Sequence, residues 1–282
     1  MSAPTLPSDS VSSIPARPFA SAVVFDDVHI SFEENEVLRG VSFQLPFGET
    51  KALFGVAGAG KSTILKLALG LLQPDSGRIT VLGNEVTRMR ELDLFPMRAH
   101  LGMVFQESAL FDSLTVRENV AFRLIEEKGV YDDETDRRVR EALRFVELEH
   151  TLDLFPSELS GGMRRRVAIA RAIITHPELL LYDSPTAGLD PVTSNTIIEL
   201  IVKQRDVAKT SSLLVTHRLQ DAFTMATHQF DPRTNQLRAL PRGQYCDVPM
   251  SFLILRDGKV IFDGDVRELA RTKDEYIKEY IS

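Results

Sequence analysis

Apolar residues follow two different spacings along this chain, and the change from one to the other marks the predicted elements. Between residues 22 and 45 apolar and polar positions alternate, which predicts short antiparallel strands. An apolar run at residues 51–54 ends in a glycine-rich loop, residues 62–72 then have helical spacing, and residues 77–82 predict another strand. Strands that alternate with helices are typical of a mainly parallel sheet covered by helices, so the pattern predicts an α/β fold.

Helical spacing dominates the middle of the chain, and strands return afterwards. Residues 113–175 carry apolar residues on one helical face, with charged residues elsewhere. Compact apolar runs at residues 179–182 and 212–215 predict buried strands of the same sheet. Near the end, two further apolar runs flank the pair Asp257 and Gly258, which is a strong signal for a hairpin.

The glycine-rich loop after the apolar run at residues 51–54 carries the clearest chemistry. It fits G-x-x-x-x-G-K-[ST], a loop that wraps phosphate groups with backbone N–H groups at a helix N-terminus. In this pattern Lys61 reaches the β- and γ-phosphates of a nucleotide, and the Ser62 hydroxyl suits Mg²⁺. We therefore predict that a nucleotide is bound by Gly55, Val56, Ala57, Gly58, Ala59, Gly60, Lys61, Ser62 and Thr63.

Two later segments suit the same nucleotide site. The run at residues 179–182 ends in Asp183, placed where P-loop proteins hold Mg²⁺. Ser160, Gly161 and Gly162 open a predicted helix, whose exposed N–H groups and positive dipole end suit a second anion. Taken alone, these three residues fit an ordinary serine N-cap equally well. The arginines at 164–166 are interpreted as a solvated face without a catalytic role.

The order of these motifs resembles that of the nucleotide-binding subunits of ABC transporters. The phosphate loop is followed by Gln106, by the signature Leu159–Gly162, by Asp183, by Asp190 and by His217, and the likeness covers roughly residues 23–264. It implies a RecA-like P-loop core with an antiparallel β subdomain and an inserted helical subdomain. It also implies ATP hydrolysis with Mg²⁺ as the cofactor.

The resemblance further assigns a role to each motif residue. Gln106 would touch Mg²⁺ and sense a transmembrane partner, and His217 would contact the γ-phosphate. Ser160, Gly161 and Gly162 would close over ATP bound to the opposite subunit, and Asp190 would couple the two sites. Mg²⁺ would be held by Ser62, Gln106 and Asp183. Phe32 stands where an aromatic side chain usually stacks on adenine, although an aromatic residue on an early strand is more often part of the core.

Two local features are similar to the Mla-type phospholipid-transport and organic-solvent-resistance ATPases. They are Met163 followed by Arg165 and Arg166, and the stretch 102–114. This likeness implies a phospholipid moved between membranes, a homodimer or a paired ATPase subunit, an integral-membrane permease and an MCE-type lipid-binding protein. Residues 106–114 are the expected permease contact.

The residue after Asp183 departs from the family pattern. That position normally holds a glutamate that polarises the attacking water, whereas this chain has Ser184. A hydroxyl without a neighbouring base does not accept a proton at neutral pH, so general-base assistance of about 10²–10⁴-fold should be missing. Three interpretations follow: the site hydrolyses ATP slowly yet adequately, the chain pairs with a different ATPase that supplies one competent site, or Ser184 is an introduced change that traps an ATP-bound state. We favour a natural, slow site. Rival functions are an ATP-gated clamp with negligible hydrolysis and a soluble, non-transport ABC protein.

Composition and charge narrow the classes of function that these motifs allow. The 282 residues carry a net charge of −7, which argues against a general nucleic-acid binder, and 43% are hydrophobic, as in ordinary globular proteins. There is no run of 18 apolar residues, and the single cysteine, Cys246, fits a reducing compartment. We expect a cytoplasmic protein held by its permease at the inner membrane. Its expected parts are a flexible leader (1–21), the cassette (22–264) with a helical subdomain (107–175) and a loop excursion (229–249), and a C-terminal helix (265–282).

Overall fold

A central six-stranded sheet organises the molecule. The computed structural model describes residues 20–241 and 243–277, and the expected leader therefore lies outside the described residues except at its last two positions. The strands run in the order β12-β11-β3-β8-β7-β6, with β12 antiparallel and the other five parallel. Their bounds are β3 (Thr50–Gly55), β6 (Leu101–Val104), β7 (Leu179–Asp183), β8 (Ser211–Val215), β11 (Met250–Arg256) and β12 (Lys259–Asp265).

The buried strands explain why the sequence folds this way. Successive residues of a strand point to opposite faces, and in β3 the side chains of Ala52 and Phe54 join one core while Leu53 joins the other. The first core packs under α5 (Gly161–Ile173), α6 (Pro191–Ala208) and α7 (Leu219–Thr227). The second packs under α1 (Lys61–Ala68) and a separate antiparallel sheet. Both faces are covered, which is why these strands are continuous apolar runs.

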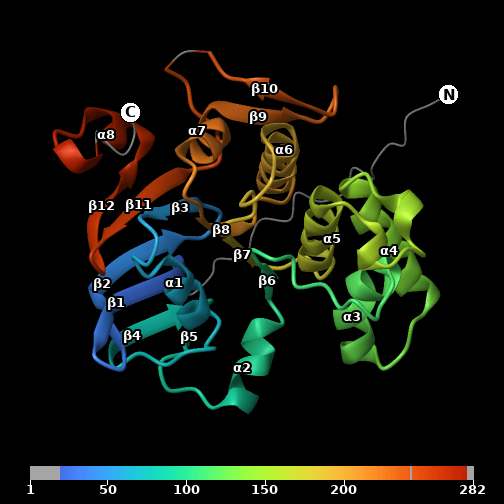
Figure 1. Ribbon diagram of the computed structural model, residues 1–282, viewed down its shortest axis with the longest axis horizontal. Coiled ribbons are helices and arrows are strands. Elements are labelled where there is room, and N and C mark those ends of the chain that lie inside the picture. Colours follow the sequence, from blue (N-terminus) through green and yellow to red (C-terminus); the bar gives the residue numbers. More distant parts are fainter. Residues whose placement is uncertain (1–19, 242, 278–282) are drawn as a thin grey trace.

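The antiparallel sheet has the order β2-β1-β4-β5. Its strands are β1 (Ser21–Phe32), β2 (Asn35–Pro46), β4 (Ser76–Val81) and β5 (Asn84–Glu85). β1 and β2 are each 12 residues long, and so longer than the short strands that the sequence predicts. Register shifts, including one between Phe25 and Val28 where Asp27 has a φ of 48°, break the alternation in sequence while the strand continues. This sheet lies at the lower left of Figure 1.

Helices form a separate layer on the other side of the parallel sheet (Figure 1). They are α3 (Val116–Lys128), α4 (Asp133–Phe145) and α5, while α2 (Glu91–Arg98) lies near β6. The 3₁₀ turns η1 (Glu149–Thr151) and η2 (Pro156–Glu158) lead into α5. Val139, Leu143 and Val146 are fully buried, as expected for one apolar face of α4 and the residue that ends it. This layer lies within residues 107–175, the range assigned to a helical subdomain from the sequence.

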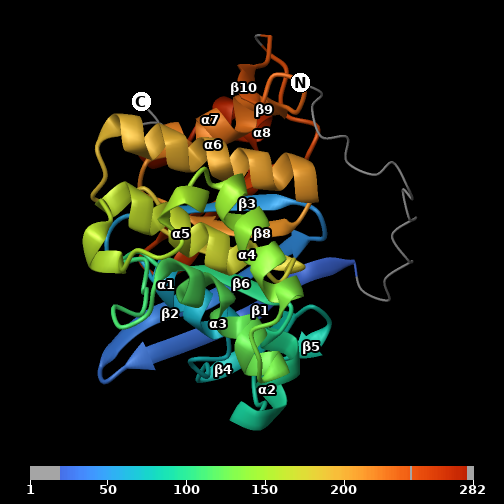
Figure 2. The same cartoon turned by 90° about the vertical axis from the view of Figure 1, so that its right-hand side faces the viewer.

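Two segments differ from the expected layout. Residues 229–249 do not form a plain loop, since β9 (His228–Asp231) and β10 (Gln236–Ala239) pair as a hairpin beside α6 (Figures 1 and 2). The buried guanidinium of Arg205 on α6 holds the hairpin by donating to the His228 carbonyl at 2.9 Å. The expected C-terminal helix is interrupted: α8 (Val266–Arg271) ends before non-helical residues 272–274, where Thr272 is extended with a ψ of 142°.

Within the described residues, no helix has both the length and the apolar character needed to cross a bilayer.

Candidate nucleotide site

The phosphate loop joins β3 to α1 and can be built only with glycine at certain positions. Gly60 has a φ of 95°, and a Cβ added there would stand 2.5 Å from Cδ2 of Leu38. At Gly55 an added Cβ would stand 2.5 Å from the carbonyl oxygen of Leu255. Glycine at these two positions lets the loop pack closely against its neighbours, as a tight phosphate-binding loop requires.

Lys61, the first residue of α1, folds back over this loop. Its Nζ donates to the carbonyl oxygens of Gly55 at 2.7 Å and Val56 at 2.8 Å. Burial lowers the pKa of Lys61, and the nearby Asp183 carboxylate partly opposes that effect. A partly desolvated cation held by two neutral carbonyls is well placed to exchange them for a phosphate anion.

The residues predicted to hold Mg²⁺ come together at the ends of β3 and β7. Ser62 Oγ donates to Asp183 Oδ1 at 3.1 Å, although the two residues are 121 positions apart. Hydroxyl and carboxylate oxygens are the hard ligands that Mg²⁺ takes, together with nucleotide phosphates and waters. Ser62, Asp183 and the neighbouring Gln106 therefore fit this ion.

A cleft of about 530 Å³ opens in front of these groups. Most of the predicted nucleotide residues line it, and Asn35 and Val37 line it too although the sequence analysis did not select them. The lining consists of Phe32, Asn35, Val37, Ala57, Gly58, Gly60, Lys61, Ser62, Thr63, Gln106, Ser184, Val215 and His217. Phe32 is 45% exposed, so its ring is at the mouth of the cleft and not in the core. Gln106, Ser184 and His217 each follow a parallel strand, and so meet at one edge of the sheet.

Ser184 occupies a tightly defined turn beside the cleft. Its φ is 46°, its amide donates to the Val215 carbonyl at 2.9 Å, and its own carbonyl accepts from the Ala187 amide at 3.0 Å. The side chain is only 7% exposed. No carboxylate is among the residues that line the cleft, and His217 is the one lining residue with an imidazole.

The signature residues and Asp190 do not line this cleft. Ser160 caps α5, accepting from the Met163 amide at 3.2 Å. Asp190 caps α6, accepting from the amides of Val192 and Thr193, each at 3.0 Å. Hydrogen bonds from the Thr193 side chain and backbone lower the pKa of Asp190. The structure thus separates the expected site residues into one group at the phosphate loop and another at two helix starts.

The interpretation of the arginines at 164–166 as a solvated face is wrong. Arg165 is only 6% exposed and donates to three main-chain carbonyls. Arg164 donates to the Leu159 carbonyl at 2.6 Å, and Arg166 to the Val146 carbonyl at 3.2 Å. Their partners are carbonyls of loops and helix ends, which no periodicity in the sequence reveals.

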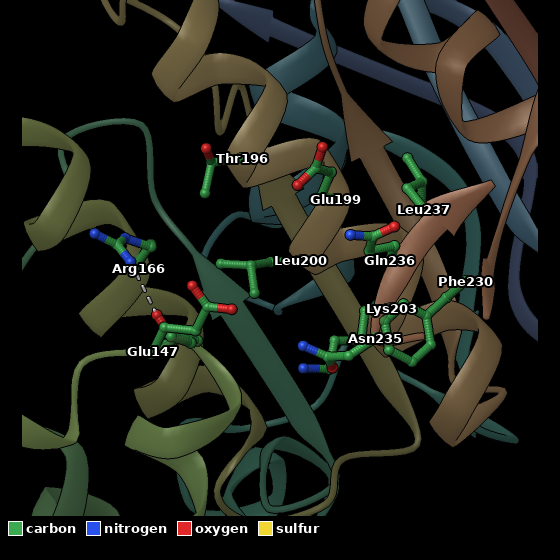
Figure 3. A pocket seen from close by; sticks show the side chains of 11 residues that line it. Glu147, Arg166, Thr196, Glu199, Leu200, Lys203, Phe230, Asn235, Gln236 and Leu237 are labelled. Carbon is green, nitrogen blue, oxygen red and sulfur yellow. Dashed lines mark hydrogen bonds between the residues drawn. The ribbon is translucent and has the colours of Figure 1, made fainter. Parts of the chain in front are cut away.

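Arg166 also lines a second pocket, of about 340 Å³, which shares no lining residue with the nucleotide cleft (Figure 3). The β9–β10 hairpin forms one wall through Phe230 and Gln236, and α6 forms another through Glu199 and Lys203. The Nζ atom of Lys203 lies 4.6 Å from the ring centre of Phe145 and 5.3 Å from that of Phe230. The segment expected to be a surface loop thus packs against the helical layer and α6.

A P-loop core with an antiparallel sheet, an inserted helical layer and this cleft defines an ATP-binding cassette. The family model described as ABC transporter matches residues 38–187, and the chain belongs to that family of ATPases. Among its relatives, the Arabidopsis thaliana chloroplastic protein TRIGALACTOSYLDIACYLGLYCEROL 3 is 37% identical over 90% of this chain and 71% of that protein. The Haemophilus influenzae intermembrane phospholipid transport ATP-binding protein MlaF is 31% identical over 87% of this chain and 84% of its own length. A methionine import ATP-binding protein MetN of Geobacillus kaustophilus is 42% identical over 64% of this chain, which spans only 52% of that relative.

Solved structures agree with this assignment. The cassette cbiO1 of Clostridium perfringens superposes with a TM-score of 0.74 and 27% identity, covering 93% of this chain and 94% of its own. A dimeric, post-hydrolysis ATP-binding cassette bound to ADP and phosphate has a TM-score of 0.71 and 28% identity, covering 87% and 99%.

Proposed function

We propose that this chain is the ATP-hydrolysing subunit of a membrane transporter that moves phospholipid between membranes, and that it works slowly. The observation that carries the proposal is the convergence of the phosphate loop, Gln106, Ser184 and His217 on one cleft at the carboxyl edge of the sheet. Lys61 would bind the β- and γ-phosphates, His217 the γ-phosphate and Phe32 the adenine. Ser62, Asp183 and Gln106 would hold Mg²⁺, which neutralises charge that develops on the phosphates.

Two chains would sandwich two nucleotides head to tail. Gly161 supports this arrangement because a Cβ added there would find nothing closer than 3.9 Å, so the start of α5 is open to an approaching surface. Ser160, Gly161 and Gly162 lie outside their own chain's cleft, and we assign them to the nucleotide held by the second chain. Asp190, at the start of α6 beside Gly162, would couple the two sites. A solved cassette with the same fold is dimeric, which supports a pair of chains.

The permease contact would be the apolar cleft beside Gln106. This cleft, of about 430 Å³, is lined by residues that include Met103, Phe105, Phe111 and Phe122. The three phenylalanines are exposed, and the rings of Phe111 and Phe122 lie 4.6 Å apart. Exposed aromatic side chains around a hollow suit an apolar helix of a membrane partner.

The segment that forms this cleft is fixed to the helical layer. Arg171 on α5 donates to the carbonyls of Ser108 and Ala109 at 2.8 and 2.7 Å. The Asn119 amide on α3 donates to the carbonyls of Phe111 and Leu114, each at 3.0 Å. A push from the permease would therefore reach Gln106 and the helices together.

The phospholipid cargo rests on the similarity to MlaF, an intermembrane phospholipid transport ATP-binding protein, and on the local likeness of Met163 and residues 102–114 to that subfamily. With it come an MCE-type lipid-binding partner and a place at the cytoplasmic face of the inner membrane. Methionine import, named for another relative, is the alternative cargo. An ATP-gated clamp is the alternative mechanism, and Ser184 favours it.

The test is ATP turnover by the chain co-purified with its permease, beside Ser184→Glu and Lys61→Ala. A general base contributes about 10²–10⁴-fold, so Ser184→Glu should raise turnover by at least about 10²-fold with little change in ATP affinity. Lys61→Ala should abolish turnover and so measures contaminating activity. Turnover no higher than that of Lys61→Ala, with ATP still bound, would establish the clamp instead. Stimulation by phospholipid vesicles but not by methionine would support the cargo, and the reverse would overturn it.

A further inference from the structure

Arg165 joins segments of the chain that are distant in sequence. It stands on the helix that begins with the signature, and its Nη1 donates to the Phe105 carbonyl at 2.8 Å and to the Gln106 carbonyl. Its Nη2 donates to the Ala187 carbonyl at 3.3 Å. One guanidinium therefore contacts the loop after β6 and the loop after β7 from α5.

Both of these loops contribute to the nucleotide cleft. Gln106 lines the cleft directly. Ala187 is tied to Ser184 because its amide donates to the Ser184 carbonyl at 3.0 Å, and Ser184 in turn is bonded to Val215 at the end of β8. Ala187 also stands three residues before Asp190, which caps α6. A displacement of Arg165 would thus move both the Gln106 loop and the Ser184 turn.

The chemistry of the site calls for arginine in particular. A guanidinium presents several N–H groups in a rigid fork, whereas lysine offers one nitrogen. The Glu107 carboxylate acts electrostatically on Arg165, and among the described residues the buried Nε of Arg165 has no hydrogen-bond partner. A methionine of similar length would remove the buried charge but would leave the three main-chain carbonyls without these donors, so the guanidinium acts here through its hydrogen bonds.

We propose that Arg165 is a positioning residue for ATP hydrolysis, which fixes Gln106 and the Ser184 turn relative to the signature helix. The inference rests on the proposed function, because it concerns the same cleft. The start of α5 would contact the nucleotide bound to the second chain. Arg165 then transmits the resulting shift of α5 to the nucleotide cleft of its own chain. Each nucleotide site is thereby made responsive to the other.

The first test follows amide hydrogen exchange in the full chain without nucleotide, comparing Arg165→Met with Arg138→Met. Arg138 is a matched control, since it donates from α4 to the carbonyl of Ile174 at the other end of α5, at 2.6 Å. With Arg165→Met, peptides covering residues 105–109 and residues 184–190 should both exchange about 10-fold faster, because the hydrogen bonds that hold both loops to α5 are lost. Arg138→Met should leave both peptides unchanged. Unchanged exchange in Arg165→Met, or an increase spread evenly over the chain, would overturn the proposal.

The second test separates positioning from simple stabilisation. In the permease complex, Arg165→Met should lower kcat about 10-fold while KM and the binding of a fluorescent ATP analogue stay within about twofold, because Lys61 is untouched. Arg165→Lys keeps the charge but not the fork, so full recovery of both loops in that variant would count against the proposal. If the parent complex hydrolyses no ATP, the proposed function fails, while the exchange measurement still decides the role of Arg165.

Discussion

Replacing Gly162 by alanine would place a methyl group against α6. The new Cβ would stand 2.4 Å from Cγ2 of Thr193, well inside van der Waals contact. The Thr193 side chain cannot easily rotate away, because its hydroxyl donates to the Asp190 carboxylate and branching at Cβ restricts its χ1 angle. Overpacking of this kind costs about 1–3 kcal/mol. For a domain of this size each kcal/mol lowers Tm by about 2–4 °C, so we expect a fall of several degrees.

Gly161 provides the matched control for this prediction. A Cβ there meets only Leu189 at 3.9 Å and Arg164 at 4.0 Å, which are ordinary contacts. Gly161→Ala should therefore keep the parent Tm. Thr193→Ser removes the offending methyl and keeps the hydroxyl, so the pair Gly162→Ala with Thr193→Ser should regain most of the lost stability. Thermal unfolding of the four variants checks this; equal Tm values for Gly161→Ala and Gly162→Ala, or no rescue by Thr193→Ser, would refute the reasoning.

Three further predictions concern the phosphate loop, the cap of α6 and the permease cleft. Gly60→Ala combines a left-handed φ with a clash against Leu38, whereas Gly58→Ala has open space and bears only the backbone strain of about 1–2 kcal/mol. Urea unfolding should therefore find Gly60→Ala clearly the less stable variant. Equal unfolding midpoints would contradict this. The pKa of Asp190 is lowered, so its charge stabilises the fold above the ordinary aspartate pKa and loses that effect as pH falls through the lowered value. Asp190→Asn should accordingly be less stable than the parent at pH 7 and match it in acid, and thermal unfolding against pH should show this gap closing, not staying constant. Phe111→Ala should weaken co-purification with the permease at least about 10-fold, as the loss of an aromatic contact at an interface does, while ATP binding by the chain alone stays unchanged. Undiminished co-purification would show that the permease binds at another surface.

Much of the fold follows from the sequence because its strands are buried on both faces. A parallel strand such as β3 must be apolar throughout, and a phosphate loop between a strand and a helix fixes the position of the cleft. Ser184 and His217 follow two strands that the sequence predicts, and residues that follow parallel strands meet at one edge of the sheet. These are consequences of local pattern combined with topology. Gln106 is expected at the site only from the family resemblance, because no strand is predicted at residues 101–104.

The remaining features depend on contacts that local pattern does not encode. The sequence pattern predicts that Arg165 is one of three exposed cations. In the structure it is buried and donates to the carbonyls of Gln106 and Ala187, which lie 59 and 22 positions away in the sequence. Asn35 and Val37 enter the cleft only because β2 begins beside the phosphate loop. The β9–β10 hairpin consists of two strands of only four residues each, and it is held by α6 through Arg205. In each case the deciding partner is far away in sequence.

The separation of the signature from its own cleft has a genetic consequence. Each nucleotide would draw its phosphate loop from one chain and its signature from another. A chain damaged at Lys61 and a chain damaged at Gly161 could therefore complement each other, because their mixed dimer keeps one wholly intact site of the two. Neither damaged chain has such a site when paired with itself. Co-expression of the two would restore partial transport in a cell where each alone gives none.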